Sequence, residues 1–203
     1  MKNIIENSLE NSISYSEYRK LVADLLAEGR STGENQTDDL LNYSKLNNSR
    51  MKRLDKTFNL SEKAVEIVQN SSKKYNWIVL TEGWCGDAAH ALPVMNKIVE
   101  ASESIELKIL LRDENEELMN KFLTNGSKSI PKLIAIDSET KEVVQSWGPR
   151  PTEATKMVVE QKEKFGSLDA NFKKDLQFWY NSNKGINLEE DMLKLLNVTA
   201  NYA

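Results

Sequence analysis

Apolar residues in the first third of the chain recur every three or four positions, which is the spacing of an amphipathic helix. One such helix is predicted from Ser16 to Glu28, ending at Gly29; its apolar positions are Tyr18, Leu21, Val22, Leu25 and Leu26. Thr37 is expected to cap a second helix and Ser61 a third. No stretch before residue 76 favours a strand, so this third of the chain is predicted to be helical.

From residue 77 onward, short β-rich runs alternate with helical segments. Strands are predicted at 77–81, 105–111, 132–136 and 142–147, with helices at about 87–102, 113–123 and 152–165. The first two strands should be parallel with a right-handed crossover, and the last two antiparallel.

Two details of the later helices are also predicted. Asp113 with Glu116 resembles a capping box at the start of the helix at 113–123. Beyond Gly166 two more helices are expected, and Phe178 with Trp179 is interpreted as the anchor that docks one of them.

The chain's only cysteine lies between the first predicted strand and the helix after it, in the sequence Trp84-Cys85-Gly86-Asp87-Ala88. Unpaired N–H groups and the positive dipole end at a helix start stabilise a thiolate, so this position favours an exposed or semi-exposed reactive thiol. The alternative is an inert cysteine that serves as a small apolar residue. The carboxylate of Asp87 opposes thiolate formation, and the simpler role for Asp87 is that of a helix-start residue.

This element order, with a Trp-Cys-Gly turn after the first strand, resembles thioredoxin, whose motif is Trp-Cys-Gly-Pro-Cys. Pro93, eight residues after Cys85, stands where thioredoxins carry a helix-kinking proline. Ile130-Pro131, just before the third predicted strand, stands where they carry a cis-proline. The resemblance covers about residues 60–166. It is nearest to bacterial thioredoxin-like proteins that carry Trp-Cys-Gly-Asp-Ala and a helical N-terminal extension.

The resemblance implies an α/β, thioredoxin-like fold with a central mixed sheet flanked by helices. The expected organisation is a helical N-terminal extension packed on the core at 1–60, a thioredoxin-like domain at 61–166 and a C-terminal helical extension at 167–203.

Two positions depart from the thioredoxin pattern. Ala88 replaces the second cysteine, so an intramolecular disulfide is impossible. Val79 occupies the place of the buried acid that in thioredoxin accepts a proton from that second thiol. The resemblance also implies that a cis bond before Pro131 presents the backbone of Ile130, beside Cys85, to a substrate peptide or glutathione. The simpler role of Pro131 is to shape its loop.

Strand directions place Arg112 and Arg150 on the same rim as Cys85. Two guanidinium groups there would lower the pKa of the thiol or hold an anionic ligand such as glutathione. The alternative is that they pair with nearby carboxylates, namely Asp113, Glu114 or Asp87. His90 lies five residues after Cys85, a poor angle for an ion pair within one helix, and is expected at the surface or rim.

Composition excludes several other classes of function. A formal net charge of −4 gives no reason to bind nucleic acid, and no apolar run is long enough to cross a membrane. One cysteine and one histidine cannot form a structural zinc site, so neither a metal nor a cofactor is expected. The first residues lack the apolar segment of a signal peptide, and the expected location is cytoplasmic.

Three functions remain open from the sequence. The first is a monothiol oxidoreductase in which Cys85 exchanges with protein or low-molecular-weight disulfides and an external thiol resolves the product. The second is a binding module that keeps the fold without turnover. The third is a redox sensor whose thiol is oxidised or glutathionylated.

Overall fold

The structure is a computed structural model that describes residues 1–71 and 73–200. Four helices precede the sheet in this part of the chain: α1 (Lys2–Glu10), α2 (Tyr15–Ala27), α3 (Asp38–Thr57) and α4 (Glu62–Gln69). The side chains of Ser14, Thr37 and Ser61 accept hydrogen bonds from the first turns of α2, α3 and α4. The caps predicted at Thr37 and Ser61 are therefore confirmed.

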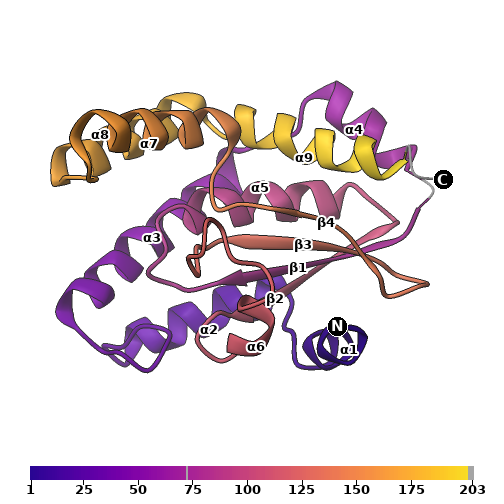
Figure 1. The fold of residues 1–203 in the computed structure, drawn as a ribbon, viewed down its shortest axis with the longest axis horizontal. Coiled ribbons are helices and arrows are strands. Elements are labelled where there is room, and N and C mark those ends of the chain that lie inside the picture. The colour runs from indigo at the N-terminus through magenta and orange to yellow at the C-terminus, as the bar shows by residue number, and fades with distance from the viewer. Residues whose placement is uncertain (72, 201–203) are drawn as a thin grey trace.

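A mixed four-stranded sheet forms the centre of the molecule (Figure 1). The strands are β1 (Tyr75–Thr81), β2 (Ile105–Leu111), β3 (Lys132–Asp137) and β4 (Val143–Trp147), arranged in the order β2-β1-β3-β4. Strands β1 and β2 are parallel and are joined by helix α5 (Ala88–Glu100), whereas β3 pairs antiparallel with both β1 and β4. The predicted α/β fold, with helices added before and after the sheet, is confirmed.

The core is centred on β1, in which all seven residues are buried. Trp77, Ile78 and Leu80 are fully inaccessible, and a buried side chain of this size stabilises the fold by about 1.5–3 kcal/mol. Tyr18 of α2 and Met51 of α3 belong to the same hydrophobic cluster. The N-terminal helices therefore pack on the sheet domain and share its core.

The segment between β2 and β3 differs from the prediction. Helix α6 spans only Glu116–Met119, and Asn115 precedes it without a side-chain cap. The expected capping box at Asp113 is wrong because this residue has other partners. Its carboxylate pairs with Arg112 at 2.7 Å, and its N–H donates to Glu82 at 3.0 Å.

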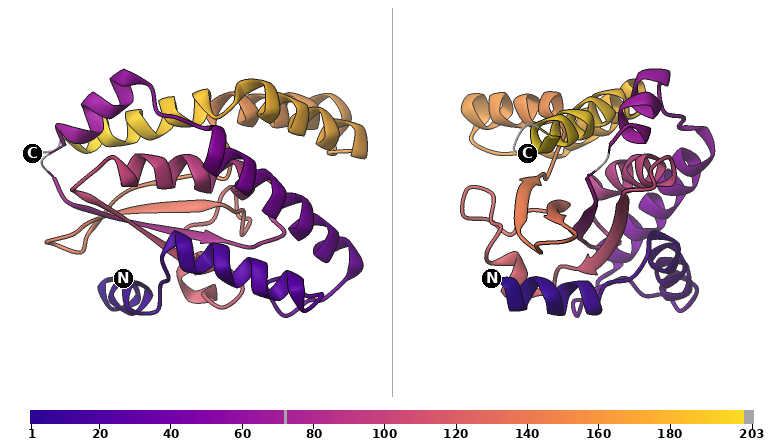
Figure 2. Two further views of the ribbon diagram at one scale, coloured as in Figure 1. Left: turned by 180° about the vertical axis from the view of Figure 1, so that it is seen from behind. Right: turned by 90° about the vertical axis from the view of Figure 1, so that its right-hand side faces the viewer.

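Three helices follow the sheet: α7 (Thr152–Phe165), α8 (Ala170–Asn183) and α9 (Ile186–Ala200). Helix α9 lies alongside α4 and α5, whereas α7 and α8 form a hairpin that extends beyond the sheet on the same side as the N-terminal half of α3 (Figures 1 and 2). The hairpin has its own small hydrophobic cluster: Ala154, Val158, Phe172, Leu176 and Tyr180. Within the described residues, no helix is long and apolar enough to span a bilayer.

The anchor predicted for α8 is corrected by this packing. Phe178 is 56% exposed and Trp179 is only partly buried. Phe172, Leu176 and Tyr180, spaced four residues apart, face inward instead.

Candidate thiol site at the start of helix α5

The turn that carries the cysteine is fixed by the N-terminal extension. The Gly83 N–H donates to the Thr32 hydroxyl at 2.8 Å, and the Gly83 carbonyl accepts from the Asn47 side chain of α3 at 3.0 Å. Thr32 and Asn47 are almost completely buried, so these bonds are shielded from water. The extension therefore sets the position of the turn between β1 and α5.

Cys85 lies at the start of α5 with its sulfur against two backbone groups. The Ala88 N–H donates to Sγ at 3.4 Å, and the thiol donates to the Ile130 carbonyl at 3.3 Å. The Ile130–Pro131 peptide bond is cis, and both residues are buried. The thiol is thus placed between a helix N-terminus and the loop that precedes β3.

This thiol is less accessible than the sequence indicates, since Cys85 is only 7% exposed. Burial, followed by the negative charge of Asp87, raises the pKa of the Cys85 thiol to about 12. The N–H groups of Ala88 and Asp87, together with the Arg150 guanidinium, oppose this increase in pKa. The exposed or semi-exposed thiol expected from the helix start is therefore replaced by a buried, protonated one.

Asp87 connects the cysteine turn to two distant segments. Its Oδ2 pairs with Arg150 at 2.8 Å, and its Oδ1 accepts a 2.9 Å hydrogen bond from the Tyr180 hydroxyl of α8. Asp87 precedes α5 but makes no side-chain cap, so a helix-start role does not describe its contacts. Burial raises the pKa of the Asp87 carboxyl, while Arg150 and Tyr180 oppose that increase.

The two arginines predicted at the rim are both paired with carboxylates, which is the alternative that the sequence left open. Arg112 pairs with Asp113 and stacks over the Trp84 ring at 4.8 Å, whereas Arg150 pairs with Asp87. Their charges are thus already partly neutralised within the protein.

His90 is buried rather than at the surface, with 4% exposure. Its ring stacks on Tyr180 at 4.3 Å with an angle of 3° between the planes, and its Nε2 lies 3.1 Å from the side-chain oxygen Oε1 of Gln177. Burial, together with the positive charges of Arg50 and Arg53, lowers the pKa of His90 to about 4, and the hydrogen bond with Gln177 opposes this decrease. The expectation of a rim position failed because α8 covers this side of α5.

The surroundings of the turn include Glu82, Gln177 and Tyr180, which the sequence pattern did not single out. Gly86 lies between α3 and α8: a side-chain carbon there would be 3.5 Å from Gln177 and 3.9 Å from Arg50. Glu82 is fully buried behind the turn, where burial raises the pKa of its carboxyl. Gln177 and Tyr180, three residues apart on α8, share one helix face, but nothing local in the sequence indicates what that face contacts.

No group of three or more histidine, cysteine, aspartate or glutamate residues in the described part of the chain is arranged to hold a metal ion. The site consists of the Cys85 thiol, the Asp87–Arg150 ion pair and the stacked rings of His90 and Tyr180.

The sheet order and the cysteine turn define a thioredoxin-type domain, and comparison with known proteins agrees. The profile of the thioredoxin family matches residues 33–166, which is more than half of the chain. The protein therefore belongs to the thioredoxin family. The matched region begins within the loop before α3, so the segment containing Asn47 is part of it.

Two solved structures share the fold. A protein of unknown function from Pseudomonas aeruginosa is 16% identical, with a TM-score of 0.56, and the match covers 94% of this chain and 99% of that one. An HIV epitope-scaffold is also 16% identical, with a TM-score of 0.56, covering 91% and 98%. No curated protein matches.

Proposed function

We propose that the protein is a single-cysteine member of the thioredoxin family whose Cys85 takes part in thiol–disulfide exchange from a latent, closed state. The observation that carries the proposal is the position of Sγ between the Ala88 N–H and the Ile130 carbonyl. The N–H can stabilise a thiolate, and the Ile130 backbone next to it offers an edge for an extended peptide.

The closed state suppresses this chemistry. Because burial raises the pKa of the Cys85 thiol to about 12, the thiol is protonated at neutral pH. The α7–α8 hairpin covers the residues that follow the thiol, because Tyr180 bonds to Asp87 and Gln177 contacts His90. Movement of α8 away from α5 would admit water and an attacking disulfide, and the thiol pKa would fall toward its ordinary value.

The exchange itself requires an external thiol. The Cys85 thiolate attacks a disulfide, forms a mixed disulfide with one half and releases the other half as a thiolate. A low-molecular-weight thiol then attacks the mixed disulfide, returning Cys85 to the thiol form and leaving with the bound half as a new disulfide. Ala88 supplies no sulfur to complete the second step within the chain.

Reaction with 5,5′-dithiobis(2-nitrobenzoate) in native buffer tests the proposal. We expect slow release of one thionitrobenzoate per chain, and dithiothreitol should then restore the free thiol. The variant Cys85→Ser should release none. Reaction that begins only when the protein unfolds would contradict the proposal.

A non-catalytic binding module is the second candidate, and the burial of Cys85 favours it. In that case the thiol to carbonyl hydrogen bond is a packing contact that stabilises the turn by about 1 kcal/mol. The same experiment separates the two functions, because a packing cysteine stays unreactive until the protein unfolds globally.

A further inference from the structure

A groove of about 800 Å³ lies between the C-terminal end of α3 and the junction of α8 with α9. Leu54, Phe58 and Ile186 supply apolar walls, and Arg53 with Lys184 supplies positive charge. Its volume is that of a site for a small organic molecule.

Neither cation of this groove forms an ion pair with a carboxylate of the described chain, although Glu189 also lines the groove. Arg53 donates to the neutral side chain of Asn181 at 2.7 Å, and no ion pair of Lys184 occurs among the described residues. The carboxylate that lines the groove, Glu189, already accepts from the N–H and the hydroxyl of Ser61, at 3.0 and 2.7 Å.

A second arginine on the same helix reinforces this charge. Arg50, one turn before Arg53, is partly buried and donates to neutral Asn47 at 2.7 Å. Burial lowers the pKa of Arg50, and the positive charge of Arg53 contributes to this decrease. The remaining arginines each have a carboxylate partner: Arg19, Arg30, Arg112 and Arg150.

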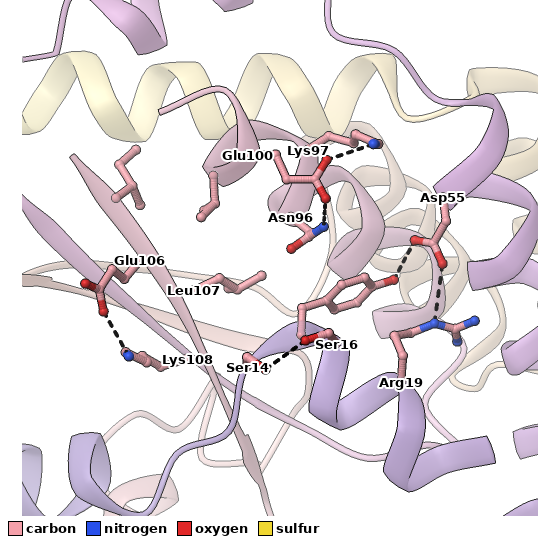
Figure 3. Close-up of a pocket in the computed structure, with 13 residues that line it drawn as sticks. Ser14, Ser16, Arg19, Asp55, Asn96, Lys97, Glu100, Glu106, Leu107 and Lys108 are labelled. Atoms are coloured by element: carbon pink, nitrogen blue, oxygen red, sulfur yellow. Dashed lines mark hydrogen bonds and ion pairs between the residues drawn. The ribbon is translucent and has the colours of Figure 1, made fainter. Parts of the chain in front are cut away.

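A second groove, between α2 and the β2 edge, provides an internal comparison (Figure 3). Each charged side chain there is paired within the groove, as Arg19 with Asp55, Lys97 with Glu100 and Lys108 with Glu106. That groove has no free charge to offer a ligand, whereas the groove at Arg53 does.

We propose that the groove between α3 and the α8–α9 junction binds a small organic anion with an apolar part. Its carboxylate, phosphate or sulfonate would lie between Arg53 and Lys184, and its apolar part would pack on Phe58 and Ile186. The proposal is independent of the chemistry of Cys85. The bound anion would nevertheless lie against Tyr180, which lines the groove and donates to Asp87.

Titration with 8-anilinonaphthalene-1-sulfonate, which combines a sulfonate with an aromatic body, tests this site by fluorescence and calorimetry. The variants Arg53→Gln and Lys184→Asn each remove one charge, and asparagine suits the left-handed backbone at position 184, where φ is +54°. Lys52→Gln, an exposed charge on the same helix that does not line the groove, is the matched control.

We expect one binding site in the wild type and in Lys52→Gln, with at least tenfold weaker binding in the two groove variants. Inorganic phosphate should compete at millimolar concentration, while uncharged N-phenyl-1-naphthylamine should bind more weakly than the sulfonate. Thermal unfolding of each variant confirms that the fold is retained. Equal affinity in all four proteins, or no binding to the wild type, would overturn the proposal.

Discussion

The Tyr180 hydroxyl donates a 2.9 Å hydrogen bond to Asp87, two residues after Cys85, from a position 93 residues further along the chain. Both residues are buried, and Arg150 holds the other oxygen of the same carboxylate. This contact joins the α7–α8 hairpin to the cysteine turn. On the proposed function, the accessibility of the thiol therefore depends on a part of the chain outside the sheet domain.

Removing the Tyr180 hydroxyl should make the Cys85 thiol more accessible to alkylating reagents. A hydrogen bond to a charged acceptor contributes about 1.5–3 kcal/mol, so Tyr180→Phe should accelerate alkylation of Cys85 by about ten- to a hundredfold. The phenylalanine ring keeps the stacking on His90. Iodoacetamide labelling followed by mass spectrometry measures the rate. Tyr43→Phe, at an exposed position of α3, is the control and should leave it unchanged.

Neutralising Asp87 should change the thiol itself. Because the negative charge of Asp87 raises the pKa of Cys85, Asp87→Asn should move the midpoint of the alkylation pH profile downward. The variant also leaves Arg150 unpaired and should lose about 2 kcal/mol of stability, measured by urea unfolding. Asp113→Asn disturbs the other arginine pair and should not move the midpoint; an equal shift in both variants would contradict this assignment.

A second cysteine at position 88 should create an internal redox pair. Residues three apart in a helical turn have Cα atoms about 5 Å apart, within the range of about 4.4–6.8 Å that a disulfide spans. Oxidised Ala88→Cys should therefore contain no free thiol by mass spectrometry, and it should reduce insulin with dithiothreitol better than the wild type. In Ala91→Cys, a buried position of the same helix, both thiols should stay free.

His90 should make stability depend on acid. The pKa of His90 is about 4 in the folded protein against 6.5 for an unperturbed histidine. The contribution of neutral His90 to the free energy of unfolding is therefore fully present above pH 6.5 and is lost as the pH falls toward 4. Between these two pH values, His90 binds a proton in the unfolded chain but stays neutral in the folded protein. Wild type should lose up to about 3 kcal/mol relative to His90→Phe. Parallel urea midpoints for the two proteins between pH 7 and 4 would contradict the effect.

The elements around the sheet could be predicted because their signals are local. The caps at Thr37 and Ser61, the four strands and the parallel pairing of β1 with β2 follow from spacing and capping chemistry. The capping box at Asp113 was wrong because the adjacent Arg112 pairs with its carboxylate and the distant Glu82 accepts from its N–H. A local sequence pattern cannot show that Glu82, 31 residues earlier, accepts from the Asp113 N–H.

The state of the thiol could not be predicted, since it depends on contacts between distant segments. The helix start at Cys85 correctly indicates nearby N–H groups, but burial outweighs them in setting the pKa. Helix α8 covers the neighbouring part of α5, where Tyr180 contacts His90 and Asp87. A helical pattern around residue 180 predicts the helix without predicting the face of the domain on which it packs.

Alkylation of Cys85 under native conditions, compared with global unfolding of the same sample, decides whether the thiol is gated or merely packed. If the α7–α8 hairpin opens locally, the free energy of the opening that permits labelling should be at least about 2 kcal/mol below that of global unfolding, and it should change little with low urea concentrations. A labelling free energy equal to that of global unfolding, with the same dependence on urea, would show that Cys85 is a core residue without exchange chemistry.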